Sequence, residues 1–130
     1  MAYVETEQLG QIMVVRMNRP ERLNALGTDM RAQLGEAWRE FRDNEDLEVA
    51  IFTGAGRAFC AGEDMKESVE QGRVNSAGEV SRDDPFMNGT LEKPVIAAVN
   101  GYAMGGGFML VERTDLRVAA KGAIFEISEA

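Results

Sequence analysis

Two short apolar runs, each ending in a tight glycine-containing loop, constrain the fold of this chain more than any other feature. Val49 to Thr53 ends at Gly54-Ala55-Gly56, and Val95 to Val99 ends at Asn100-Gly101. An apolar run of about five residues bounded by turn residues is typical of a buried strand. We therefore expect both runs to lie inside a layered fold, with the loops at the ends of the strands.

The first fifty residues predict a hairpin followed by a helix. Tyr3 to Gln8 and Gln11 to Met17 are strand-like runs separated by a Leu-Gly pair, which is the pattern of a β-hairpin. Pro20 ends the second run, and either Asn24 or Thr28 is expected to cap the helix. Four apolar residues at helical spacing predict its buried face: Met30, Leu34, Trp38 and Phe41. Four charged residues predict a solvated opposite face: Arg31, Glu36, Arg39 and Arg42.

The rest of the chain continues this alternation of strands and helices. Asp64 is expected to cap a short helix through Glu70, and the polar segment from Gly72 to Pro85 could serve as a lid. A further helix is expected from about Phe108 to Arg113. Two strand-like runs follow it: Leu116 to Ala119 and Ala123 to Ile127. Strands that alternate with helices favour an α/β fold.

Composition excludes several classes of function. The absence of histidine removes Ser-His-Asp and Cys-His catalysis and most zinc sites from this segment. A general base must then be a carboxylate, a lysine or something rarer. The formal net charge of −8 argues against nucleic acid, although a local basic pocket could still hold a phosphorylated small molecule. The single cysteine, the absence of a membrane-length apolar run and the lack of a signal-like N-terminus favour a cytoplasmic protein.

Two glycine-rich loops carry the residues from which a function can be argued. They run from Gly56 to Asp64 and from Asn100 to Gly107, and each follows a predicted buried strand and leads into a predicted helix. At a helix N-terminus the first N–H groups lack an intrahelical partner and point outward with the positive end of the helix dipole. Two converging loops of this kind would give the pair of N–H donors that an oxyanion requires. The alternative interpretation is that these glycines only form tight turns and allow close packing.

Nucleotide-binding glycine motifs do not fit these loops. Phe59 stands where a dinucleotide fingerprint that begins at Gly54 needs its third glycine. A P-loop needs Lys and then Ser or Thr after its last glycine, but Phe108-Met109 follows Gly107. Neither motif is present.

Three segments form a distinctive series along the chain: Asn18-Arg19-Pro20 with Asn24-Ala25-Leu26, then Thr53 to Gly62, then Lys93 to Ala103 with the triplet Gly105 to Gly107. In this order they resemble the hallmark segments of the enoyl-CoA hydratase/isomerase superfamily, the crotonases. The resemblance implies an α/β spiral of ββα units, incomplete in this chain, and a subunit of about twice this length. Residues 1–130 would then be the N-terminal part of the core domain, with the C-terminal helical part absent from the sequence.

The resemblance also implies roles for individual residues. The N–H groups of Ala61 and Gly106 would form the oxyanion hole, and Arg22 would be a candidate for contact with a coenzyme A phosphate. Glu129 would be the acid/base group. The other carboxylate usual in hydratases, on the helix after the glycine triplet, falls on Met109, which favours double-bond isomerisation over simple hydration. The implied substrate-binding residues are Arg22, Leu23, Ala25, Ala61, Gly62, Glu63, Asp64, Gly105 and Gly106.

Other reactive side chains near these loops have simpler interpretations. Glu129 is also compatible with a plain first-turn helix position, where a carboxylate is favourable with the dipole. Glu126, three residues earlier, either enters the same pocket or faces solvent at a strand edge. Glu112 is expected at the surface. Cys60 is expected to be a packed residue rather than a nucleophile, since no histidine can activate it.

The function implied is that of an acyl-CoA-processing lyase or isomerase, of the kind used in fatty acid metabolism, which stabilises a thioester enolate. Coenzyme A would enter as part of the substrate, with no metal and no tightly bound cofactor. The assembly implied is a homotrimer or hexamer, with the C-terminal half supplied in the same chain or as a separate fragment. Two alternatives stay open: a crotonase-fold thioester hydrolase or decarboxylase, and a non-catalytic acyl-CoA-binding or oligomerisation module.

Overall fold

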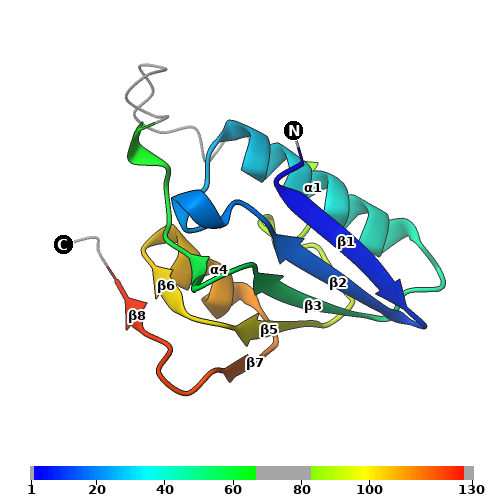
Figure 1. Cartoon of the computed structure of the whole chain (residues 1–130). Helices are drawn as coiled ribbons and strands as arrows, with labels where there is room; N and C mark the ends of the chain where they lie inside the picture. Colours follow the sequence, from blue (N-terminus) through cyan, green and yellow to red (C-terminus); the bar gives the residue numbers. More distant parts are fainter. Residues whose placement is uncertain (1, 67–82, 128–130) are drawn as a thin grey trace.

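A five-stranded sheet forms the body of the molecule (Figure 1). The computed structural model describes residues 2–66 and 83–127. In the hairpin, β1 and β2 are antiparallel as predicted, whereas β2, β3, β5 and β7 run parallel to one another. In spatial order the strands are β1 (Val4–Leu9), β2 (Ile12–Met17), β3 (Val49–Gly54), β5 (Val95–Val99) and β7 (Leu116–Ala119).

A second, smaller sheet is built from the strands that follow β3, β5 and β7. These are β4 (Ala58–Cys60), β6 (Tyr102–Met104) and β8 (Phe125–Glu126), paired in parallel in that order. Helix α4 (Gly106–Arg113) follows β6, which completes a ββα unit. This repeat is the architecture that the sequence resemblance implied. Because β4 and β6 are neighbours, the turns at their carboxyl ends are brought side by side.

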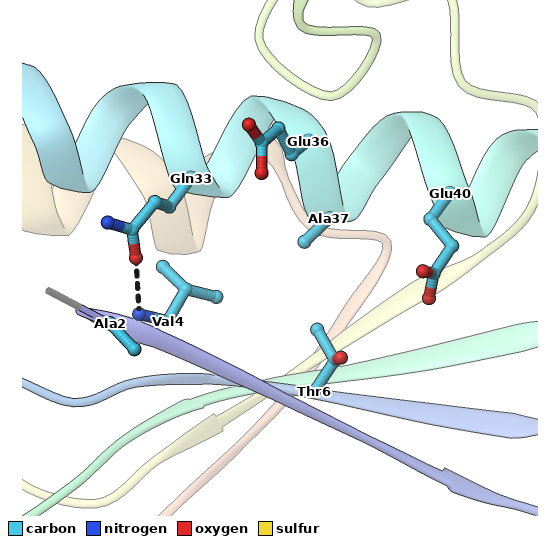
Figure 2. Close-up of a pocket in the computed structure, with 7 residues that line it drawn as sticks. All are labelled: Ala2, Val4, Thr6, Gln33, Glu36, Ala37 and Glu40. Carbon is cyan, nitrogen blue, oxygen red and sulfur yellow. Dashed lines mark hydrogen bonds between the residues drawn. The ribbon is translucent and has the colours of Figure 1, made fainter.

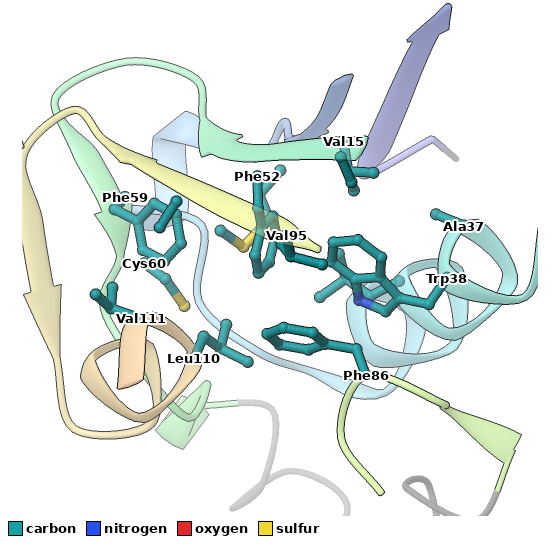
Figure 3. Close-up of a cluster of buried hydrophobic side chains, with 14 of the residues drawn as sticks. Val15, Ala37, Trp38, Phe52, Phe59, Cys60, Phe86, Val95, Leu110 and Val111 are labelled. Carbon is teal, nitrogen blue, oxygen red and sulfur yellow. The ribbon is translucent and has the colours of Figure 1, made fainter. Parts of the chain in front are cut away.

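Helix α1 (Thr28–Asp43) covers one face of the large sheet and carries the predicted apolar stripe inward (Figure 1). The Trp38 ring meets Phe52 of β3 edge-on, with 5.0 Å between ring centroids, and stacks on Phe86 at 4.8 Å (Figure 3). Aromatic pairs of this kind contribute about 1 kcal/mol each beyond the burial of their area. The cluster thus fixes α1 and the segment around Phe86 against the strands that lead to the glycine loops.

The start of α1 differs from the sequence prediction. Its N-cap is Gly27, in an extended conformation and without a side-chain capping bond, and Thr28 is the first helical residue. Asn24 lies before the helix in a left-handed conformation (φ 56°) and is fully buried. The capping prediction was wrong because the Asn24 side chain bonds to distant backbone instead.

Three predictions concern residues outside the described part of the chain, at least in part. The helix expected from Asp64 to Glu70 is described only as far as residue 66, and the segment expected to form a lid, from Gly72 to Pro85, only from residue 83. Glu129 lies beyond the described residues altogether.

Candidate active site

The first glycine loop turns sharply after β4 and is held by the segment that precedes α1. The N–H of Leu26 donates to the Gly62 carbonyl at 2.7 Å, and the N–H of Asp64 donates to the Leu26 carbonyl at 2.9 Å. Leu26 and Glu63 therefore form a short parallel bridge. In this pattern the main chain of residue 63 is fixed from both sides.

Hydrogen bonds of the turn decide which of its N–H groups can serve a ligand. The N–H of Ala61 donates to the Leu23 carbonyl at 3.0 Å. This bond contradicts the assignment of an oxyanion donor to Ala61, because its single N–H is already used by the fold. The N–H of Gly62 hydrogen-bonds the Cys60 sulfur, and that of Asp64 is used by Leu26. The remaining residue of the turn is Glu63, whose backbone nitrogen lies close to the second loop.

The second glycine loop contains two glycines with different structural requirements. A Cβ on Gly107 would collide with the Cys60 carbonyl, so this glycine is needed for packing. Gly106 is the first residue of α4, and its N–H consequently has no intrahelical partner. A Cβ on Gly106 would meet nothing closer than Leu26 Cδ1 at 3.4 Å, and its φ is not left-handed. The fold therefore does not require glycine at position 106.

The two turns converge at Gly106. The point where a Cβ on Gly106 would stand is 3.7 Å from Gly62 Cα and 3.9 Å from the backbone nitrogen of Glu63. Reciprocally, a Cβ on Gly62 would stand 3.2 Å from the Gly106 nitrogen. A side chain at 106 would thus fill the space next to these amides, and its absence lets a ligand approach the backbone closely. Main-chain N–H groups that lie close together, one of them at a helix N-terminus, are donors of the kind that stabilise a developing negative charge.

Next to this site, a buried carboxylate holds two arginines. Asp64 has only 3% of its surface exposed and is paired with Arg19 Nη1 at 3.1 Å and Arg22 Nη1 at 3.3 Å. The Arg22 side chain remains 34% exposed. Asp64, which directly precedes the helical residues 65–66, anchors the loop of residues 19–22 to the turn, and Arg22 is held there with part of its surface open to solvent.

Two buried or partly buried asparagines fix the path of the chain into β4, a role that the sequence patterns did not predict. Asn24 Nδ2 donates to the carbonyls of Ala55 and Ala58, each at 3.0 Å, and its Oδ1 accepts from the Arg19 N–H at 2.8 Å. Asn100 Nδ2 also donates to the Ala58 carbonyl, at 3.0 Å. The Ala58 carbonyl, at the start of β4, thus accepts a hydrogen bond from each asparagine side chain.

The other residues that the family resemblance assigned to the site lie around the two turns. Leu23 supplies the carbonyl that Ala61 binds, and Ala25 is buried. Gly105 precedes α4 with a left-handed φ of 50°, and its N–H donates to the Glu126 carbonyl at 2.8 Å. The Glu126 side chain is exposed, as are Met109 and Glu112.

Cys60 is buried under the site, and its chemistry is suppressed. Its thiol donates to the Asn24 carbonyl at 3.1 Å. Burial raises the pKa of the thiol to about 12. Because the thiolate is the nucleophilic form, Cys60 serves as a packed residue, in agreement with the sequence interpretation.

A separate hollow of about 550 Å³ lies between β1 and α1 (Figure 2). Its charged lining residues are Glu36 and Glu40, and Gln33 accepts a hydrogen bond from the Val4 N–H there. A lining whose only charges are negative does not suit a phosphate-bearing ligand. Among the described residues, no group of His, Cys, Asp and Glu is arranged to hold a metal ion, and no helix is long and apolar enough to cross a bilayer.

The ββα arrangement, with its two sheets and with neighbouring turns that bring main-chain amides close together, defines the class of the fold as α/β. The chain belongs to the enoyl-CoA hydratase/isomerase family, whose model matches residues 7–130.

Relatives and solved structures agree with this assignment. The chain is 38% identical over 128 residues to an (E)-benzylidenesuccinyl-CoA hydratase from Thauera aromatica, covering 97% of this chain and 50% of the relative. It is 41% identical over 129 residues to the enoyl-CoA hydratase EchA19 of Mycobacterium tuberculosis, covering 95% and 48% respectively. An enoyl-CoA hydratase structure from Mycobacterium tuberculosis superposes with a TM-score of 0.87 at 36% identity, over 98% of this chain and 49% of that one. The chain thus spans about half the length of these proteins.

Proposed function

We propose that this chain carries the oxyanion site of an enzyme that processes acyl-CoA thioesters by way of an enolate. The thioester carbonyl oxygen accepts hydrogen bonds from the N–H groups of Glu63 and Gly106. Negative charge that develops on this oxygen as a proton leaves C2 is stabilised by both donors and by the positive end of α4. The observation that carries the proposal is the approach of the Glu63 nitrogen to the open position beside Gly106.

The proton at C2 requires a separate acid/base group, and Glu129 remains our choice for it. With one carboxylate the natural reaction is a double-bond shift, in which the same group removes a proton and returns it elsewhere. Met109 stands where hydratases usually have their other carboxylate, and its side chain cannot donate a proton. This favours a double-bond shift over hydration. The relatives' names favour hydration instead, which would need an acid from outside residues 1–130.

Proton exchange at C2 tests the enolate mechanism even when the product of the reaction has not been identified. The full-length protein is incubated in D₂O with a panel of saturated and unsaturated acyl-CoA thioesters, and deuterium at C2 is followed by mass spectrometry. We expect exchange with at least one thioester and a large loss of exchange in Glu129→Gln. Undiminished exchange in that variant would remove Glu129 from the mechanism. Tight binding without exchange or turnover across the panel would favour the non-catalytic module, and release of free coenzyme A would favour the hydrolase.

The rest of the substrate is expected to lie along the loop of residues 19–25. Arg22 keeps a partly exposed guanidinium beside the site, and Asp64 holds it there at 3.3 Å. A guanidinium suits a phosphate oxygen, so we assign Arg22 the coenzyme A end of the substrate. No cofactor enters this mechanism other than coenzyme A as part of the substrate.

Assembly is a second part of the proposal. Leu116 and Val118 of β7 and Ile127 after β8 are each more than 60% exposed, at 63%, 68% and 67%. Apolar side chains concentrated at a sheet edge are typical of a surface that another segment covers. We assign this edge to the part of the relatives that this chain does not span, and the complete assembly to a trimer or hexamer. Size measurement of the full-length protein by light scattering tests the assignment of a trimer or hexamer.

A further inference from the structure

One ion pair connects helix α1 directly to the turn that bears the oxyanion site. Arg31 Nη2 lies 2.7 Å from Glu63 Oε1. The Arg31 side chain is only 13% exposed, and the Glu63 side chain is 39% exposed. Sequence patterns placed Arg31 on a solvated helix face. That interpretation was wrong because Glu63, which is distant in sequence, comes back against the first turn of α1.

Burial of the Arg31 side chain has an energetic cost that an exposed arginine does not have. Its Nε is buried and has no hydrogen-bond acceptor among the residues that the structure describes. A buried donor without a partner is unfavourable. By contrast, Arg42 near the other end of the same helix pairs with Asp43, and both side chains are largely exposed, at 46% and 64%. Arg31 is thus held in a position that helix stability alone does not explain.

The charge of Glu63 gives a reason for this arrangement. In the proposed mechanism the N–H of Glu63 donates to an oxygen that becomes negative. The carboxylate of the same residue, if unpaired, would repel that charge across a partly desolvated site, and such repulsion acts over several ångströms. A guanidinium bound to the carboxylate at 2.7 Å largely cancels its field.

We propose that Arg31 is a positioning residue that neutralises the Glu63 carboxylate and so allows a glutamate to occupy the oxyanion turn. This inference rests on the proposed function and deepens it, because it states which charge beside the site must be compensated. Arg31 touches no reacting atom. Its effect is transmitted through Glu63 and is felt most when the enolate charge develops.

A double-mutant cycle on the full-length protein distinguishes this role from a structural one. Arg31→Met is expected to lower kcat on the order of tenfold with a smaller change in KM, because the lost compensation matters most in the transition state. In the Glu63→Gln background the same substitution is expected to cost less than about threefold, because no carboxylate is left to compensate. Arg31→Lys keeps the charge and should retain more activity than Arg31→Met. Arg42→Met, which removes the exposed pair of the same helix, is the matched control and should leave kcat and KM unchanged.

Melting temperatures of all variants are measured so that kinetics are compared on folded protein. An equal loss of kcat from Arg31→Met in both backgrounds, or a loss of less than twofold with Glu63 present, would overturn the proposal. Failure of the proposed function gives a different result: Gly106→Ala would then retain full turnover whatever the behaviour of Arg31. Full sensitivity to Gly106→Ala together with insensitivity to Arg31→Met would refute only the role of Arg31.

Discussion

The backbone nitrogen of Glu63 lies 3.9 Å from the point where a Cβ on Gly106 would stand, although the two residues belong to different ββα steps of the chain. Three structural features produce this approach. The pairing of β4 with β6 places the two turns side by side, the Leu26 bridge fixes the first turn, and the contact of Gly107 with the Cys60 carbonyl draws α4 against β4.

Replacement of Gly106 by alanine separates function from folding. The added Cβ meets its nearest atom at 3.4 Å and the backbone is not left-handed, so the melting temperature should change little. The same methyl group occupies the space beside the Glu63 amide, and loss of access to one oxyanion donor is expected to reduce kcat about 100-fold. Steady-state kinetics and thermal unfolding of the same preparation measure both effects.

Gly107→Ala provides the opposite case. Its Cβ would overlap the Cys60 carbonyl, so backbone must move and the variant should lose at least about 2 kcal/mol of unfolding free energy. If Gly106→Ala were the less stable of the two variants, the distinction between a packing glycine and a site glycine would be mistaken.

Asn24 is expected to be among the most sensitive polar positions. Asn24→Ala removes two donors and one acceptor from a buried site and leaves the Ala55 carbonyl without this partner, for a loss of about 3 kcal/mol. Urea unfolding monitored by Trp38 fluorescence measures this loss. Asn88→Ala, on an exposed loop, should cost less than about 1 kcal/mol. Similar losses in the two variants would mean that the clamp around β4 contributes little.

Cys60 should make the protein less stable at alkaline pH. Burial raises the pKa of its thiol from the ordinary 9.0 to about 12 in the folded chain. Between these values the unfolded chain releases a proton that the folded chain keeps, so this contribution to stability is complete below pH 9 and falls as pH rises. The slope approaches about 1.4 kcal/mol per pH unit above pH 9. Cys60→Ala should lack this slope, and identical pH dependence in both proteins would contradict the assignment.

The elements that the sequence predicted well are those with a local signal. The runs Val49 to Thr53 and Val95 to Val99 lie in β3 and β5, because short apolar runs between turns have few alternative structures. The stripe through Trp38 is buried because helical spacing fixes which side chains share a face. β4 and β6, with three residues each, are too short for such a pattern.

The parts that the sequence could not predict depend on contacts between distant segments. The second loop was correctly expected to lead into a helix, although α4 begins at Gly106 and not at about Phe108. The choice between Ala61 and Glu63 as donor depends on the bond from the Ala61 N–H to the Leu23 carbonyl and on the register of the Leu26 bridge. Arg31 looked like a surface residue because its partner lies 32 positions away. In each case the local pattern predicted the helix or strand, whereas the arrangement of the site depends on how distant loops pack against one another.

A bound thioester reports the proposed hydrogen bonds through its own carbonyl group. The infrared stretch of a carbonyl-¹³C acyl-CoA, bound to the full-length protein, should move to lower wavenumber than in water, because two fixed donors polarise the bond more than solvent does. In Gly106→Ala most of that shift should disappear while the thioester still binds. A carbonyl stretch that is unshifted in the unmodified protein, with binding verified in the same sample, would contradict a shared oxyanion site at Glu63 and Gly106.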